Sequence, residues 1–183
     1  MPKVSEEHLA ARRAQILEGS RRAFAEHGYG GATVARLEEA TGLSRGAIFH
    51  YFEDKQDLFV ELAFDTNRRL GDILVERGLD ATIRAVAEES PDWLGVLIEV
   101  EGKLRHDPEF VRRMEVRTTQ GGRFVTWFEE RQADGTVRDD MPALELARFA
   151  TSLINGLALR VAGQDPFDVD ATLRLLNDAL APR

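Results

Sequence analysis

The amino-acid sequence predicts an all-α protein in which a small N-terminal three-helix domain is joined by a long helix to a larger helical bundle. Apolar residues recur every three or four positions along most of the 183-residue chain, which is the period of an amphipathic helix. Glycines, prolines and polar capping residues divide this pattern into segments of helical length. No segment shows the alternation of a half-buried strand. We expect residues 1–53 to form the small domain and residues 54–183 the bundle.

Capping residues and glycines predict the helices of the small domain. A first helix is expected from about residue 7 to residue 27, ending at Gly28. One of its faces carries Ile16, Ser20, Ala23, Phe24 and His27. Thr33 can cap a second helix, Gly42 supplies the positive φ of a sharp turn, and Ser44 can cap a third helix. This spacing alone is equally compatible with two packed helices in any small bundle.

The start of the third helix carries the residues Arg45, Gly46 and Ala47. Small residues let a helix approach another surface closely, and an exposed arginine at this end suits the major groove of DNA. An aromatic cluster follows at residues 48–52, and Lys55 comes shortly after it. The helix–glycine–helix geometry leaves a helix-turn-helix and an ordinary packed pair equally open, and the aromatic cluster decides between them through its resemblance to a known family.

These elements together resemble the DNA-binding domain of TetR-type transcriptional regulators. The resemblance spans about residues 12–62, and many of its elements stand at fixed offsets from one another. The matching residues are Ala23, Phe24, Gly28, Tyr29, Thr33, Val34, Gly42, Ser44, Gly46, Phe49, Tyr51, Phe52, Lys55 and Leu58. It implies a sequence-specific regulator, most often a repressor, that binds a palindromic operator in double-stranded DNA and is released by a small-molecule effector.

The expected DNA contacts lie at the start of the second helix, in the third helix and just beyond it. They are Thr33, Arg45, Gly46, Ala47, Phe49, His50, Tyr51 and Lys55. Arg45 is placed to pair with the edge of a guanine, whereas Tyr51 and Lys55 match family residues that grip phosphates. Phe49 stands where the family often has tyrosine, so a phosphate hydrogen bond is lost or replaced there. His50 and Tyr51 are the candidates to compensate, and the sequence leaves open which of them faces outward.

Glycines, prolines and capping residues also predict the remaining helices. They are expected to begin near residues 54, 79, 91, 108, 142 and 169. Gly78 should end the long helix, and the last helix should run from Val169 to Leu180. The segment that starts at Pro108 is expected to continue as one helix beyond Phe124, with Gly121-Gly122 as an internal weak point. Each glycine there costs about 1 kcal/mol relative to alanine.

The last two helices are too apolar to face water on all sides. Beyond one core stripe they carry enough leucine for a second contact, which a twofold-related copy could cover in a four-helix interface. The residues predicted at this interface are Leu153, Leu157, Leu173 and Leu176. Resemblance to the family implies the same homodimer, because its members associate through their last two helices. A single buried hairpin within a monomer is the alternative.

The middle helices are expected to enclose a pocket for a small, anionic effector. Its candidate contacts are Arg117 first, then Arg105 and Asn155, although each is also compatible with an ordinary solvated residue. The chain further resembles an actinobacterial subgroup of the family that represses the aconitase gene, at residues 1–13, 44–50, 104–105, 107–108 and 137–142. That resemblance implies control of aconitase or central metabolism and a Mg²⁺-bound tricarboxylate as effector. A diverged paralogue with another effector remains an equal alternative.

The formal net charge of −8 is unevenly distributed along the chain. Residues 1–55 contain eight basic and eight acidic residues, so the later segment carries the whole excess of acid. A neutral DNA-binding domain on an acidic body weakens non-specific binding to DNA and leaves specific contacts to hold the complex.

Other classes of protein are disfavoured by what the sequence lacks. It has no cysteine, which excludes disulfides and thiolate metal sites, and its four histidines lack metal-binding or catalytic spacing. We therefore expect no enzymatic activity, no metal site and no required cofactor. No apolar run approaches the ~20 residues of a membrane span or forms the core of a signal peptide, so a cytoplasmic protein without membrane partners is expected. A helical protein-interaction bundle that does not bind DNA is the rival interpretation.

Overall fold

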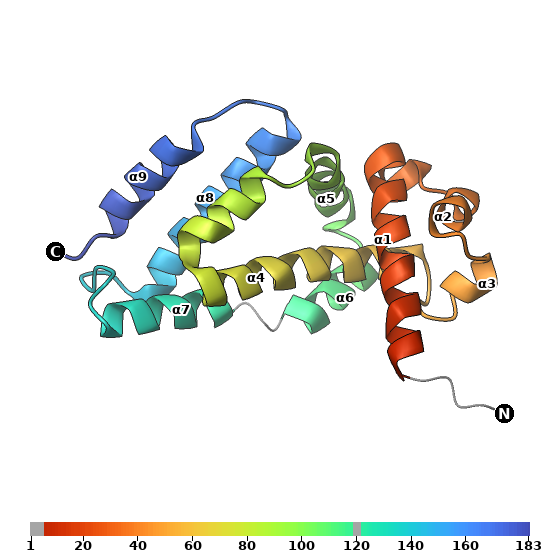
Figure 1. The fold of residues 1–183 in the computed structure, drawn as a ribbon, viewed down its shortest axis with the longest axis horizontal. Coiled ribbons are helices and arrows are strands. Elements are labelled where there is room, and N and C mark those ends of the chain that lie inside the picture. The colour runs from red at the N-terminus through yellow and green to blue at the C-terminus, as the bar shows by residue number, and fades with distance from the viewer. Residues whose placement is uncertain (1–5, 119–121) are drawn as a thin grey trace.

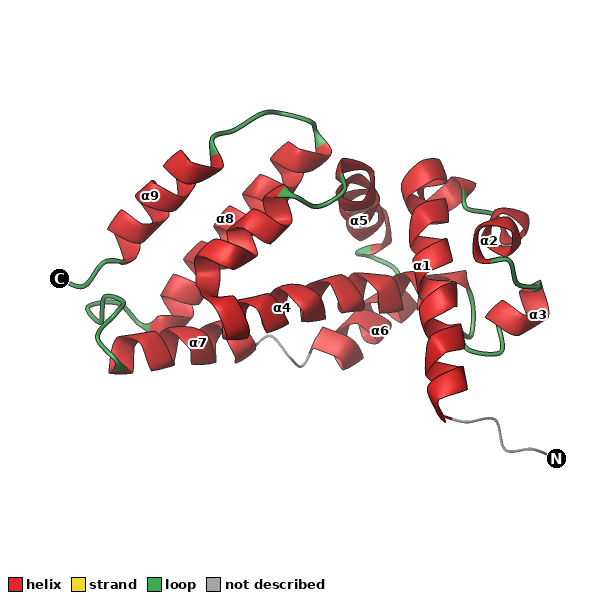
Figure 2. Ribbon diagram, in the orientation of Figure 1, coloured by secondary structure: helices red, strands yellow, loops and turns green. Residues whose placement is uncertain are grey.

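The computed structural model describes residues 6–118 and 122–183, except for the side chains of residues 6 and 115–118. Every regular element of these residues is an α-helix, which confirms the predicted fold class (Figure 2). The helices are α1 (Glu6–Gly31), α2 (Val34–Thr41), α3 (Arg45–Ile48), α4 (Lys55–Ala87), α5 (Pro91–Leu104), α6 (Pro108–Thr118), α7 (Gly122–Ala133), α8 (Ala143–Ala162) and α9 (Val169–Leu180).

The long helix α4 connects the two ends of the molecule (Figure 1). Its first turns lie against α1, and α2 and α3 form the tip on the far side of α1. Its later turns lie among α7, α8 and α9, so the C-terminus is at the opposite end from α3 (Figure 1). We refer to α1–α3 as the head and to the remaining helices as the body.

Side-chain caps begin several helices where the sequence places capping residues. Thr33, Ser44, Asp54 and Ser90 each accept a hydrogen bond from the amide three residues later, at 3.4, 3.3, 2.8 and 3.3 Å. Such a cap contributes about 1 kcal/mol by satisfying an amide that the helix leaves unpaired. The predicted caps at Thr33 and Ser44 are thereby confirmed.

Glycines stop the regular backbone inside α1 and α4. Gly28 has φ of 69° and Gly78 has φ of 82°, a left-handed region that other residues enter only at a cost. The chain re-enters helix directly afterwards, so each element is bent at its glycine. Both glycines are the predicted helix ends.

The prediction of one continuous helix from Pro108 beyond Phe124 depends on residues 119–121, which lie outside the described residues. Helix α6 ends at Thr118, and α7 begins at Gly122 and runs separately along the body (Figure 1). Gly121 itself lies outside the described residues.

Two apolar clusters form the core. The first joins the head to the early part of α4 and to α5 and α6, with Phe24, Phe59 and Trp93 at its centre. The second joins the later part of α4 to α7, α8 and α9, around Leu74 and Phe128. The head therefore shares its core with the body and is held against it by buried apolar surface.

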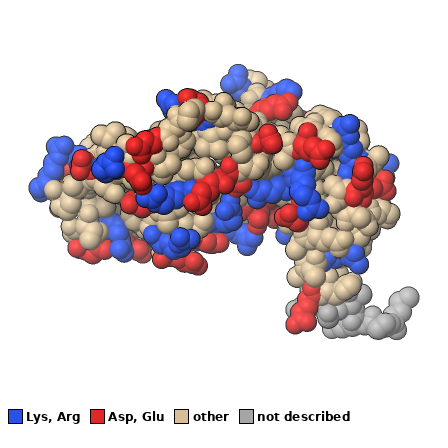
Figure 3. Space-filling model, turned by 45° about the horizontal axis from the view of Figure 1, so that its top comes forward, with Lys and Arg blue, Asp and Glu red and all other residues tan. Residues whose placement is uncertain are grey.

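Charged residues of both signs are interleaved over the face shown in Figure 3, without a large stretch of one sign. Within residues 6–118 and 122–183, no helix combines the length and hydropathy needed to cross a membrane.

Candidate DNA interface and effector cavity

Close packing of α2 on α1 holds the helix-turn-helix together. A Cβ atom at Gly19 would lie 2.6 Å from the carbonyl oxygen of Ala40, so only glycine permits this approach. The side-chain amide of Gln15 also donates to the carbonyl of Thr41, at 2.8 Å. Leu37 is fully buried between the helices. Gly42 then turns the chain with φ of 69°, as predicted.

The short helix α3 presents its first residues to solvent. Ile48 is fully buried and anchors the helix, and the Arg45 amide donates to Glu38 Oε1 at 2.7 Å. This anchoring leaves Arg45 and Gly46 exposed and Ala47 half-buried. A Cβ atom at Gly46 would meet no described atom within 4 Å, so packing within the chain does not require glycine there. The space is open for a second molecule.

The aromatic segment after α3 divides between core and solvent. Phe49 and Tyr51 are half-buried against the first core cluster, whereas His50 is exposed. The rings of His50 and Tyr51 meet edge to face with centroids 5.5 Å apart. Of the two candidates that the sequence leaves open, His50 is therefore the one that faces outward.

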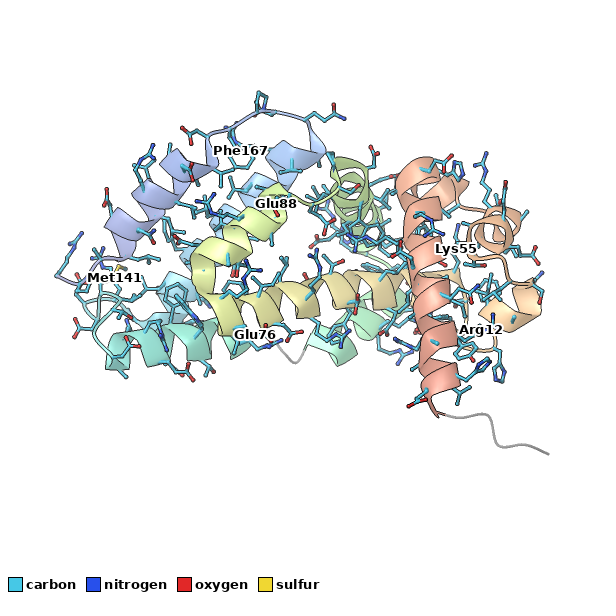
Figure 4. The ribbon with its side chains drawn as sticks, viewed as in Figure 1. Arg12, Lys55, Glu76, Glu88, Met141 and Phe167 are labelled. Carbon is cyan, nitrogen blue, oxygen red and sulfur yellow. The ribbon has the colours of Figure 1, made fainter. Side chains whose placement is uncertain are left out.

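Lys55 and Thr33 are the two remaining predicted DNA contacts, at the starts of α4 and α2. The Lys55 ammonium donates to the carbonyl of Tyr29 at 2.9 Å and lies 4.6 Å from the centroid of the Tyr29 ring. Burial lowers the pKa of Lys55. Figure 4 shows Lys55 beside α1 in the head, far from Met141 and Phe167 at the other end of the molecule. Thr33 is exposed and its hydroxyl oxygen caps α2.

A cavity of about 610 Å³ lies between α4, α6, α7 and α8. Its described lining has an apolar part that includes Phe64, Met114 and Phe124. Its polar part includes the guanidinium groups of Arg68, Arg123 and Arg148. The volume lies within the range of small-molecule sites, and arginine is the residue best suited to hold a carboxylate or phosphate. Within the chain these arginines pair with carboxylates of Asp65, Asp72 and Glu145, respectively.

The predicted effector contacts are dispersed. Asn155 lies on the lining of the cavity. Arg105 is exposed at the end of α5, donates to His106 Nε2 at 3.1 Å, and does not line the cavity. The side chain of Arg117 lies outside the described part of the chain.

Arg123 is a cavity residue that the sequence reasoning missed. It donates to Asp72 Oδ1 at 2.7 Å, and a Cβ atom at Gly71 would lie 2.9 Å from its Nη1 atom. Gly71 on α4 therefore makes room for this guanidinium. The only sequence signal was an arginine placed directly after Gly121-Gly122.

The leucines predicted at a dimer interface occupy different environments. Leu157, Leu173 and Leu176 are buried in the chain's own second core cluster, at 5%, 4% and 2% exposed. Leu153 is half-buried. The large apolar side chains that α8 and α9 expose are Leu144, Phe149, Leu159 and Leu175. We name these four exposed side chains the α8–α9 face, and Leu144 among them also lines the cavity.

Comparisons with known proteins agree with this geometry. The family described as "Bacterial regulatory proteins, tetR family" matches residues 16–62. The HTH-type transcriptional repressor Rv1474c of Mycobacterium tuberculosis is 44% identical over 184 residues, which cover 98% of this chain and 98% of that protein. The HTH-type transcriptional repressor AcnR of Corynebacterium diphtheriae is 39% identical over 184 residues, covering 98% of this chain and 97% of that protein.

Structural similarity leads to the same fold. Salmonella enterica GusR superposes with a TM-score of 0.75 at 21% identity, covering 97% of this chain and 98% of that one. The sequence relatives are named as transcriptional repressors and not as enzymes. With a helix-turn-helix head, a helical body and relatives that match along almost the whole chain, this protein belongs to the TetR family of bacterial transcriptional regulators.

Proposed function

We propose that this protein is a cytoplasmic, homodimeric transcriptional repressor that binds a palindromic operator and is released by a small-molecule effector. In this proposal residues 1–53 bind DNA, and residues 54–183 dimerise and bind the effector. The observation that carries the proposal is the exposed surface of Arg45, Gly46 and His50 on a short helix anchored by the buried Ile48. Similarity to AcnR repressors supports a target such as aconitase or another gene of central metabolism.

The dimer provides the link between effector and operator. Two recognition helices of a dimer enter successive major grooves when they lie about one helical turn, ~34–36 Å, apart. An effector that binds better to a conformation with another spacing shifts the population away from DNA, and only by its difference in affinity for the two states. The α8–α9 face supplies the apolar contact between the subunits.

Exchange of Arg45 for alanine should weaken operator binding by about 1–3 kcal/mol per half-site, because a guanidinium paired with a guanine discriminates among bases by that amount. Binding to a scrambled duplex should change much less. The measurement is the dissociation constant for both duplexes across a salt series, with the operator first selected from a random pool of duplexes.

Lys55→Ala is the comparison variant, because a contact to phosphate positions the protein without reading sequence. It should weaken binding to both duplexes about equally and lower the salt slope by about one unit per subunit. The melting temperature must be measured in parallel, since Lys55 also donates a hydrogen bond to the carbonyl of Tyr29. Equal losses on both duplexes for Arg45→Ala would make Arg45 a phosphate contact and leave base reading to Ala47 and His50.

Arg123→Gln should weaken effector binding at least about tenfold, because a hydrogen bond between two charged groups is worth about 1.5–3 kcal/mol. The effector is found by a thermal-shift screen of anionic metabolites, with citrate tested with and without Mg²⁺. Arg105→Gln is the matched control, since this exposed arginine does not line the cavity. Arg117→Gln tests the residue that the sequence favoured. Equal affinity for Arg123→Gln and the parent protein would place the effector elsewhere.

A further inference from the structure

The carboxylate of Glu38 on α2 binds the backbone of the first residue of α3. Its Oε1 atom accepts a hydrogen bond from the Arg45 amide at 2.7 Å. The two residues are 7 positions apart, and the turn at Gly42 lies between them. Helices α2 and α3 together form the tip of the head (Figure 1). The hydrogen bond therefore joins two helices across the turn.

Helix α3 needs this contact because it is only 4 residues long. Ile48, its last residue, is the one that is fully buried. The Ser44 hydroxyl caps α3 at 3.3 Å from the Ala47 amide, but Ser44 directly precedes α3 and moves with it. A single helical turn held by one buried side chain can rotate about that side chain. The Glu38 carboxylate supplies a second fixed point, at the opposite end of α3.

Helix α2 gives Glu38 a firm base. Leu37 is fully buried against the head. The Arg22 guanidinium of α1 donates to the carbonyl of Ala40 at 3.0 Å, and the Gly42 amide donates to the carbonyl of Glu38 at 2.8 Å. The backbone that carries the Glu38 side chain is thus held from both sides, so the position of its carboxylate determines the position of the Arg45 amide.

The charge of Glu38 has a separate effect on DNA binding. The carboxylate lies within hydrogen-bonding distance of Arg45, which is exposed and is the predicted base contact. A negative charge at such a surface repels the phosphates of any duplex, whatever its sequence. The adjacent Glu39 is exposed and its side chain has no hydrogen bond or ion pair within the described residues. Glu39 therefore carries the same charge without the contact to α3.

We propose that Glu38 is a positioning residue for sequence recognition. Its bond to the Arg45 amide holds α3 in the orientation that reads the operator, and its charge weakens binding to every duplex. The two effects act together to favour the operator over other DNA. The effect on recognition rests on the proposed function, because the orientation of α3 matters only if α3 contacts DNA. The bond itself is a property of the free protein.

Hydrogen exchange of the Arg45 amide, followed by nuclear magnetic resonance, tests the bond without DNA. Glu38→Asp shortens the side chain by about 1.5 Å and keeps the charge, so the carboxylate no longer reaches the amide. Exchange should become at least about tenfold faster, because a bonded amide exchanges only when its bond opens. Glu38→Gln retains an acceptor oxygen and should stay within about threefold of the parent. Glu39→Asp is the matched control and should exchange like the parent.

Binding to operator and to scrambled duplex then separates reach from charge. Glu38→Asp should lower the ratio of operator affinity to scrambled affinity about fivefold to tenfold, since the fixed point of α3 is lost while the charge remains. Glu38→Gln should bind both duplexes about twofold to threefold more tightly at low salt and keep the parent ratio. Glu39→Gln, which removes the same charge one residue away, should also keep that ratio. Circular dichroism checks that each variant keeps its helices.

Three results would overturn the inference. The first is an Arg45 amide that exchanges as slowly in Glu38→Asp as in Glu39→Asp. The second is the parent ratio of affinities in Glu38→Asp, and the third is unchanged binding of Glu38→Gln to the scrambled duplex. If the parent protein binds no duplex, the proposed function fails, whereas the exchange result still decides whether Glu38 holds α3.

Discussion

Phe59→Ala is expected to lower the free energy of unfolding by about 3–5 kcal/mol, the usual cost of removing a buried aromatic ring and leaving a cavity. Phe59 is 1% exposed, and its ring lies 5.4 Å from that of Phe24, 5.2 Å from that of Tyr29 and 5.8 Å from that of Trp93, between centroids. These four rings come from α1, α4 and α5. Loss of the Phe59 ring should weaken the packing of the whole first core cluster and with it the contact between head and body.

Denaturant unfolding followed by circular dichroism measures this effect at one fixed protein concentration, because dissociation of a dimer contributes to apparent stability. Leu9→Ala on the exposed surface of α1 is the control, and it should change stability by less than about 0.5 kcal/mol. A loss below about 1 kcal/mol for Phe59→Ala would contradict the packing described around this ring.

Two adjacent leucines of α9 are expected to respond to aspartate in opposite ways. Leu176 is 2% exposed within the subunit, so Leu176→Asp buries an unpaired charge and should cost about 4 kcal/mol or more in the free energy of unfolding. Leu175 is 72% exposed on the α8–α9 face. Leu175→Asp should leave the subunit folded but dissociate the proposed dimer, because the charge would be buried only between subunits.

Sedimentation velocity at micromolar concentration, combined with circular dichroism, separates these outcomes. A folded monomer is expected for Leu175→Asp, and an unfolded or aggregated chain for Leu176→Asp. Leu159→Asp, at the 60% exposed Leu159 of α8, should repeat the Leu175→Asp result. A parent protein that sediments as a monomer, or a Leu175→Asp dimer as tight as the parent, would place the contact between subunits on another surface.

Local chemistry made much of the fold and head predictable from the sequence. The caps at Thr33 and Ser44 and the positive φ angles of Gly28, Gly42 and Gly78 depend on a few neighbouring atoms. Such signals act over one turn of backbone, so the sequence shows them directly. These signals alone were equally compatible with any packed pair of helices, and the aromatic residues 48–52 with the family resemblance identified the helix-turn-helix.

Local chemistry was insufficient to identify the residues of the cavity. Arg105 was expected at an effector pocket but is exposed at the end of α5, whereas Arg123 lines the cavity. Which side chains meet there depends on how α4, α6, α7 and α8 pack, and helical periodicity does not supply that information.

By itself, the sequence determined most of the helix starts and the surplus of leucine on α8 and α9, and its resemblance to a known family identified the helix-turn-helix. Only the tertiary structure decided that Leu176 lies inside the subunit while Leu175 lies outside. It also decided that Arg113 binds Asp54 and Glu53, at sequence separations of 59 and 60. Helical periodicity defines the faces of a helix but not the partner of each face. That choice depends on how distant helices pack together, and both the cavity and the contacts of Arg113 follow from it.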